Sequence, residues 1–215
     1  MKGFAGEFET HLTVVPGAMA GDEGRIRRWA AHHRVKYTRI VLDRGATPEQ
    51  PMLTVRGHGG LPAQREAALT WVERLEAEGF GVARVKIEAA PWNEDVPRTA
   101  AEAQELPPGC YFEHHVKVAL ADESEVAAVR ELAERHTAHV SRNARRELGA
   151  SGHERFITQR CRDVGRAEAR RRLDALLDAL AAVGFKAVEV EEEFVVHDDR
   201  PALDSGWIEE KADVR

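Results

Sequence analysis

The chain has 215 residues, of which 43% are hydrophobic and 32% charged, and its formal net charge at pH 7 is −6. This composition is typical of a globular protein with one large core or two small ones, and its acidic balance argues against nucleic-acid or anionic-membrane partners. Two cysteines without paired spacing, and no signal peptide or long apolar stretch, predict a cytoplasmic protein with no membrane partner.

The first half of the chain predicts alternating strands and helices. Residues 7–15 alternate polar and apolar side chains, as a half-buried strand does. A helix with the apolar stripe Ile26, Trp29 and Ala30 follows it. The remaining elements are strands over 37–42, 52–55 and 82–89 and a helix that begins at Pro62 and ends at Gly79.

The second half repeats the first. Phe-Glu-Thr-His-Leu-Thr-Val at 8–14 matches Phe-Glu-His-His-Val-Lys-Val at 112–118, and residues 53–56 match 157–160 at the same offset. Gly79 and Phe80 match Gly184 and Phe185 one residue later in register. Several matches in one order indicate a tandem duplication. The second set of elements includes a helix with Val126, Val129 and Leu132 inward, a strand near Val140, a helix rich in leucine and a last strand over 187–196.

The order strand-helix-strand-strand-helix-strand predicts the fold class. We expect an α+β protein made by tandem duplication of a ferredoxin-like βαββαβ unit, with antiparallel sheets and the helices on one face. The expected divisions are a first unit over 1–92, a linker over 93–109, a second unit over 110–197 and a C-terminal tail over 198–215. Apolar anchors such as Trp207 predict that the tail packs on the body.

Polar residues recur at matching positions on the face of each sheet that lies away from the helices. The matched pairs are Glu9 with Glu113, His11 with His115, Arg56 with Arg160 and Glu88 with Glu193. If the two sheets face each other, these side chains meet in one polar cleft, which is the usual form of a ligand site. The alternative is that this face is simply solvated, as in many antiparallel sheets.

We expect a small anionic metabolite, bearing phosphate or carboxylate, to bind in that cleft, with turnover an open question. The groups nearest to any chemistry would be His11, Glu113, His115 and Lys117. The side chains expected to hold the ligand are Thr54, Arg56, Lys86, His139, Ser141, Asn143, Thr158 and Arg160. The alternative for the basic members of this set is internal pairing with the many glutamates.

The first strand of each unit carries a histidine followed two residues later by a polar side chain. His11-Leu12-Thr13 and His115-Val116-Lys117 resemble the paired His-x-Thr and His-x-Ser elements of the two-histidine phosphoesterases. That resemblance implies a histidine acid and base with hydroxyl groups that hold phosphate. The second element departs from the pattern, because Lys117 stands where a hydroxyl is expected.

The same histidines also suggest a metal site. His11, Glu88, His115 and Glu193 give one imidazole and one carboxylate per repeat, a donor set that suits Fe(II), Mn(II), Ni(II) or Zn(II). The placement of ligands on first and last strands is similar to that of the vicinal-oxygen-chelate enzymes. Glu9 and Glu113 are alternative ligands. The other interpretation is that each histidine only hydrogen-bonds its neighbouring glutamate.

Four phrases, mainly in the second half, resemble those of a bacterial family to which no activity is attached. They are Phe-Glu-His-His-Val-Lys at 112–117, His-Val-Ser-Arg-Asn at 139–143, Thr-Gln-Arg at 158–160 and Leu-Asp-Ser-Gly-Trp at 203–207. The resemblance therefore implies no function. A non-catalytic scaffold or interaction module stays open beside the ligand-binding hypotheses, and the sequence indicates neither a substrate nor an oligomeric state.

Overall fold

The computed structural model describes residues 3–15, 22–143 and 153–208, and their strands close into one eight-stranded barrel. The strand order around the barrel is β1-β3-β2-β6-β7-β5-β8-β4. The strands are β1 (Ala5–Val14), β2 (Lys36–Leu42), β3 (Glu49–Gly60), β4 (Val82–Ala89), β5 (Tyr111–Leu120), β6 (Ala138–Asn143), β7 (His153–Cys161) and β8 (Lys186–Asp198).

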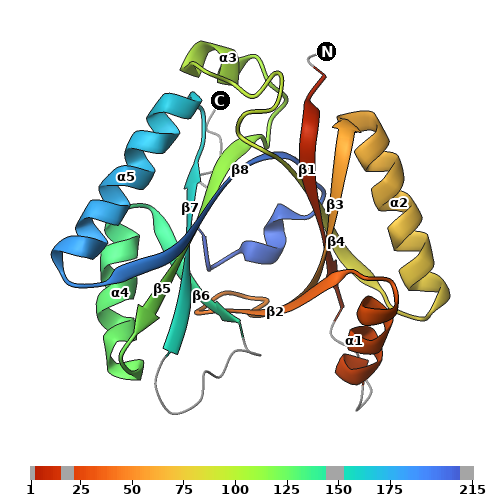
Figure 1. Ribbon diagram of the computed structural model, residues 1–215, viewed down its shortest axis with the longest axis horizontal. Helices are drawn as coiled ribbons and strands as arrows, with labels where there is room; N and C mark the ends of the chain where they lie inside the picture. The colour runs from red at the N-terminus through yellow and green to blue at the C-terminus, as the bar shows by residue number, and fades with distance from the viewer. Residues whose placement is uncertain (1–2, 16–21, 144–152, 209–215) are drawn as a thin grey trace.

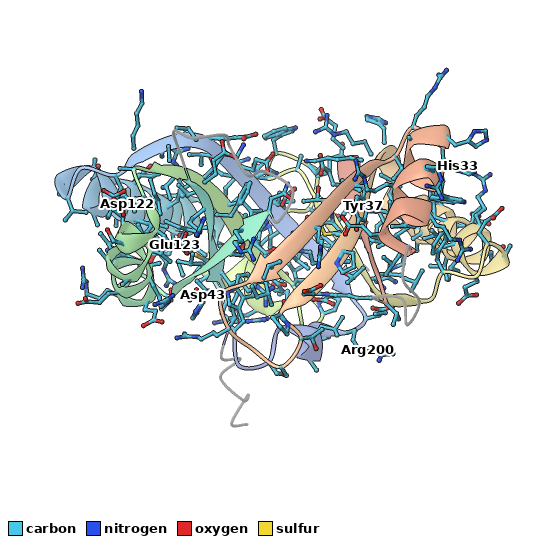
Figure 2. All side chains as sticks on the ribbon, turned by 90° about the horizontal axis from the view of Figure 1, so that it is seen from below. His33, Tyr37, Asp43, Asp122, Glu123 and Arg200 are labelled. Atoms are coloured by element: carbon cyan, nitrogen blue, oxygen red, sulfur yellow. The ribbon has the colours of Figure 1, made fainter. Side chains whose placement is uncertain are left out.

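The helices lie on the outside of the barrel, two for each half of the chain (Figure 1). They are α1 (Asp22–His32) and α2 (Leu61–Ala77) in the first half, and α4 (Val126–Arg135) and α5 (Arg166–Ala182) in the second. Seen from below in Figure 2, His33 and Tyr37 mark the α1 side of the molecule, while Asp122 and Glu123 mark the opposite, α4 side. The α+β class, the antiparallel pairing and the duplicated ferredoxin-like unit are those predicted from the sequence.

The two halves join edge to edge instead of standing as separate sheets. Strands β2 and β6 pair over 40–42 and 141–143, and β4 pairs with the last residues of β8. Residues 186–193 of β8 pair with β5 but have no ladder partner on their other side within the described chain. The polar faces of both sheets therefore turn inward, and the cleft expected between two sheets takes the form of a barrel interior.

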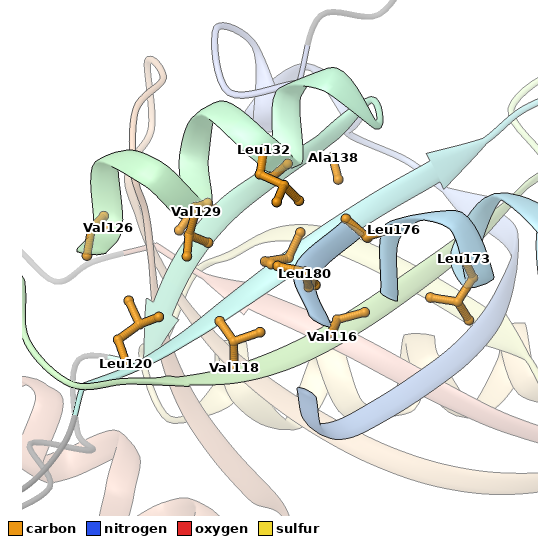
Figure 3. Close-up of a cluster of buried hydrophobic side chains, with 13 residues drawn as sticks. Val116, Val118, Leu120, Val126, Val129, Leu132, Ala138, Leu173, Leu176 and Leu180 are labelled. Atoms are coloured by element: carbon orange, nitrogen blue, oxygen red, sulfur yellow. The ribbon is translucent and has the colours of Figure 1, made fainter. Parts of the chain in front are cut away.

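The hydrophobic core lies between the sheet and the helices, outside the barrel. In the second half, Val116, Leu132, Leu173 and Leu180 pack together beneath α4 and α5 (Figure 3). Leu12, Trp29 and Leu75 belong to the equivalent cluster of the first half. Each fully buried aliphatic side chain contributes about 1.5–3 kcal/mol to folding, so these clusters stabilise the fold and leave the interior free for polar side chains.

A short linker and the C-terminal tail close the molecule. The linker carries helix α3 (Ala100–Gln104), where the Thr99 hydroxyl accepts from the Glu102 amide in a capping box. The tail continues from β8 into the 3₁₀ helix η2 (Pro201–Asp204), seen through the barrel in Figure 1. The side chains of Trp207 and Ile208 are buried there. The unit boundaries given above stay predictions, and residues 209–215 of the predicted tail lie outside the described chain.

No helix of the described part of the chain is long and apolar enough to cross a membrane.

Candidate functional site

Two cavities lie inside the barrel and at its open seam. The inner cavity has a volume of about 220 Å³ and takes side chains from both halves of the chain and from the tail. The second, of about 480 Å³, lies where β8 parts from β4 and is called the vestibule here. Glu9, Glu191 and Glu193 line both spaces. The two cavities therefore meet at these three carboxylates.

The structure brings most of the predicted site residues together. Those that line the inner cavity are His11, Thr54, Lys86, Glu113, His115, Lys117, Ser141, Asn143, Thr158, Arg160 and Glu193. Glu88 and Arg56 line the vestibule, where the Arg56 side chain is 81% exposed. His139 lines neither cavity, and its Nδ1 lies 3.3 Å from a guanidinium nitrogen of Arg44. The roles assigned to these residues stay predictions.

The two repeats hold their histidines in the same way. In the first, His11 Nδ1 hydrogen-bonds with Thr54 Oγ1 at 3.0 Å, and its Nε2 lies 2.5 Å from Glu88 Oε2. In the second, His115 Nδ1 hydrogen-bonds with Thr158 Oγ1 at 3.1 Å, and its Nε2 lies 3.4 Å from Glu193 Oε2. Strand register sets this match, because His11 pairs with Thr54 and His115 with Thr158 across neighbouring strands.

Ion pairs extend from these histidines through the barrel. Lys86 Nζ lies 2.6 Å from Glu88 Oε1 and donates to Glu113 Oε1 at 2.6 Å. Arg160 then joins Glu113 to Asp204, with both contacts at 2.6 Å. The series ends at Arg84, whose guanidinium contacts both Asp204 and Asp198. We call this connected set the interior network; its members are His11, Arg84, Lys86, Glu88, Glu113, His115, Arg160, Glu193, Asp198 and Asp204.

The interior network contains more acid than base. Three permanently basic side chains, Arg84, Lys86 and Arg160, face five carboxylates, so neutrality requires two further positive charges. Buried charge that is not compensated is strongly unfavourable. The missing charge can be supplied by protons on the histidines and carboxylates, or by a divalent cation that replaces them.

The pKa values show where those protons lie when no cation is bound. Burial alone would lower the pKa of His115, but hydrogen bonds to Glu113 and Glu193 outweigh it and raise the pKa to about 10. Burial raises the pKa of Glu193 to about 7, and repulsion from Glu88 adds to this while His115 opposes it. Burial acts in the same direction on Glu88, yet Lys86 and His11 lower its pKa well below the ordinary value. At neutral pH His115 is therefore protonated and charged, and Glu193 is a mixture of its protonated and ionised forms.

Two overlapping groups of side chains have the geometry of a metal site. Glu88, His115 and Glu193 place one donor atom each within 4.8 Å of one another, and so do Glu9, His11 and Glu193. Glu193 belongs to both groups. Each threonine contacts Nδ1 of its histidine, so the other ring nitrogen, Nε2, faces a carboxylate: Glu88 in the case of His11 and Glu193 in the case of His115. Metal-binding histidines usually hydrogen-bond in this way through the ring nitrogen that does not bind the metal.

The basic residues predicted to bind an anion all have carboxylate partners. Arg160 and Lys86 contact two carboxylates each, within the barrel. Arg56 donates to Glu9 at 2.8 Å, and Lys117 contacts Glu189, whose side chain is 48% exposed. Of the two interpretations given by the sequence, these contacts favour internal pairing for Arg56, Lys86 and Arg160. Lys117 differs from them because its partner is half in solvent.

One wall of the inner cavity is apolar. It is formed by Ile40, Leu42, Met52, Phe156 and Trp207. Trp207 donates from its indole Nε1 to the Val140 carbonyl at 2.8 Å, which fixes the orientation of the ring. Sequence reasoning missed this wall. It also missed Arg84 and Asp204, although the alternation of Arg84 with Lys86 and Glu88 was a usable signal for the first.

Comparisons with known proteins add no function. No family model matches the chain, and no curated protein matches it. Among solved structures, the regulatory subunit of aspartate kinase from Thermus thermophilus is 15% identical, with 82% of this chain and 94% of that chain covered and a TM-score of 0.36. The acetolactate synthase small subunit from Thermotoga maritima is 12% identical (86% and 92%, TM-score 0.31). Chlorite dismutase from Candidatus Nitrospira defluvii is 8% identical (89% and 91%, TM-score 0.30). At these values the likenesses carry no conclusion about the site.

Proposed function

We propose that the chain binds one divalent metal ion at the junction of the inner cavity and the vestibule, and presents it to a small molecule. The ligands in this proposal are Glu88, His115 and Glu193, which form one group of converging donors, together with His11 from the overlapping group of Glu9, His11 and Glu193; Glu9 is an alternative carboxylate. The observation that carries the proposal is the repeated arrangement in which a threonine holds Nδ1 of a histidine while its Nε2 faces a glutamate of the last strand.

Charge supports the same conclusion. A divalent cation bound by neutral imidazoles and ionised glutamates supplies the two positive charges that the interior network lacks. It also replaces the proton of His115 and the proton that Glu193 carries in part at neutral pH. Mixed nitrogen and oxygen donors suit Mn(II), Fe(II), Ni(II) or Zn(II).

The position of the site favours a role in binding a small molecule. Its donor atoms border the cavities, so an ion held by three of them, or one such as Mn(II), Fe(II) or Ni(II) that takes more than four ligands, would have a coordination position for a small molecule. The anionic metabolite expected from the sequence enters this proposal as a ligand of the metal and not of the arginines. An oxygen of that molecule bound to the ion would be polarised, which is the chemistry such an ion supplies.

Metal titration by isothermal calorimetry tests this proposal. Purified chain, stripped with chelator and titrated with Zn(II), Mn(II) or Ni(II), should bind one ion per chain. The double variant H11Q/H115Q should lose that binding, whereas H139Q, outside both cavities, should retain it. Equal binding by wild type and the double variant would contradict the proposal.

A further inference from the structure

We propose that the inner cavity takes a small amphipathic monocarboxylate of about nine non-hydrogen atoms in all, with its apolar body lying on the apolar wall and its carboxylate directed at Lys117 and the metal. Only one part of the inference, the contact between the carboxylate and the metal, rests on the proposed metal site. The apolar wall, the cavity size and Lys117 carry it independently of the metal.

The apolar wall is a feature that the fold does not require. Leu42 and Trp207, which are 4% and 5% exposed, form a small cluster with Ile208 that is separate from the large clusters beneath the helices. Met52 and Phe156 occupy the same position in the two repeats, on β3 and β7, and both line the cavity. An apolar surface that faces an open, otherwise polar barrel interior gains free energy when an apolar body covers it.

The volume limits the size of that body. A dry cavity of about 150 Å³ holds one benzene molecule, and the inner cavity measures about 220 Å³. A phenyl ring with a carboxylate, or a branched chain of similar size, therefore fits. Eight-stranded barrels commonly have room for one such ligand.

Lys117 selects the charge of the ligand. Its Nζ lies 5.4 Å from the centre of the Phe156 ring, so it adjoins the apolar wall directly. The Lys117 side chain is buried, whereas its carboxylate partner Glu189 is 48% exposed, so the carboxylate of a ligand can take the place of Glu189 beside Lys117 and leave Glu189 in solvent. Lys86 and Arg160 each contact two buried carboxylates and are not available in this way.

An amine at the same position would be repelled by Lys117, whereas a carboxylate is attracted to it. The amine would lie beside the ammonium group of Lys117, and the carboxylates left to pair with it would be those of Glu189 and Glu191, which also line the cavity. A neutral alcohol of the same shape would cover the apolar wall but would leave Lys117 with Glu189. The cavity should therefore rank the carboxylate, which pairs with Lys117, above both the alcohol and the amine.

Thermal shift and calorimetry with benzoate, benzyl alcohol, benzylamine and acetate test the inference, using full-length chain with and without Zn(II). Benzoate should bind at least tenfold more tightly than the other three. M52W, which fills the cavity, should lose benzoate binding, while L69W, on the exposed face of α2, should retain it. Without Zn(II), K117M should bring benzoate down to the affinity of benzyl alcohol, and it provides a second variant should M52W fold poorly.

Two results separate this inference from the metal proposal. If Zn(II) binds as proposed but benzoate does not bind, or binds no better than acetate, the inference is overturned and the metal site stands. If benzoate binds wild type but not M52W or K117M while Zn(II) does not bind, the inference stands and the metal proposal fails. Unchanged benzoate binding in both variants also overturns the inference, because the molecule then binds elsewhere.

Discussion

The two histidine sites are equivalent by duplication, yet they differ in charge. In the first, His11 lies beside Glu88, and Lys86 neutralises that carboxylate from the neighbouring position on β4. In the second, the residue that corresponds to Lys86 on β8 is Glu191, so Glu193 has no lysine beside it, whereas Glu113 contacts Lys86 and Arg160. Duplication preserved the geometry, and a change of charge on one strand left Glu193 without the lysine partner that Glu88 has.

The largest expected effect follows directly from this difference. H115Q should weaken divalent-metal binding by at least a hundredfold, because it removes the histidine ligand beside Glu193, the carboxylate that has no lysine partner. H11Q should weaken it by about tenfold, since Glu88 already has Lys86 as a partner. Calorimetric titration of both variants measures the difference, and equal losses would show that the two sites contribute equally.

The corresponding glutamates should change stability in opposite directions. Folding raises the pKa of Glu193, so ionisation of this side chain destabilises the metal-free fold. Its contribution to the free energy of unfolding is fully present below about pH 4.5 and is lost as the pH rises through about 7. E193Q should therefore stabilise the metal-free chain at pH 8, by about 1–3 kcal/mol. The pKa of Glu88 is lowered, so its ionised form stabilises the fold at that pH.

E88Q should accordingly destabilise the metal-free chain by about 3 kcal/mol, as expected when one partner of a buried ion pair is removed. Urea denaturation at pH 8 measures both variants against wild type, and a repeat at pH 4.5 is the control, where E193Q should have little effect. Destabilisation by E193Q at pH 8 would contradict the charge assignment.

Metal affinity should rise with pH. Below about pH 10 a metal ion must displace the His115 proton, and below about pH 7 it must also displace the Glu193 proton. Affinity should then increase about tenfold per pH unit above pH 7, and more steeply below it. Calorimetry at pH 6, 7 and 8 in buffers of different ionisation enthalpy counts the released protons. A pH-independent affinity would exclude His115 as a ligand.

The smallest effect is expected from the threonines. T158V and T54V remove the hydrogen bond that orients each histidine, and such contacts usually change metal affinity by about tenfold. T158V should have the greater effect if the second site dominates. The comparison of T158V with T158S, which keeps the hydroxyl, separates orientation from packing, and equal affinity in both would remove the threonine from the site.

Local pattern was enough to predict which residues face the interior. Alternation in β5, which only His114 interrupts, placed Glu113, His115 and Lys117 on one face and Val116 on the other. It failed for the length of β3, which runs to Gly60 although its glycines resemble a loop. Gly57 has a packing reason, because a Cβ there would lie 1.9 Å from the Gln64 side chain of α2.

Closure of the barrel could not be predicted in the same way. It depends on a few pairs between β2 and β6, and on the extension of β8 along β4, and neither has a local sequence signal. Asp204 enters the interior from the tail, which has no counterpart in the other repeat. Long-range contacts of this kind decide that the polar faces enclose a cavity and do not face solvent.

Anomalous diffraction from crystals grown with Zn(II) or Mn(II) tests the central claim most directly. The account predicts one strong peak about 2.0–2.2 Å from His115 Nε2 and from a Glu193 oxygen, at the junction of the two cavities, and its loss in H115Q crystals. Peaks confined to exposed side chains, with His115 still between Glu113 and Glu193, would contradict it.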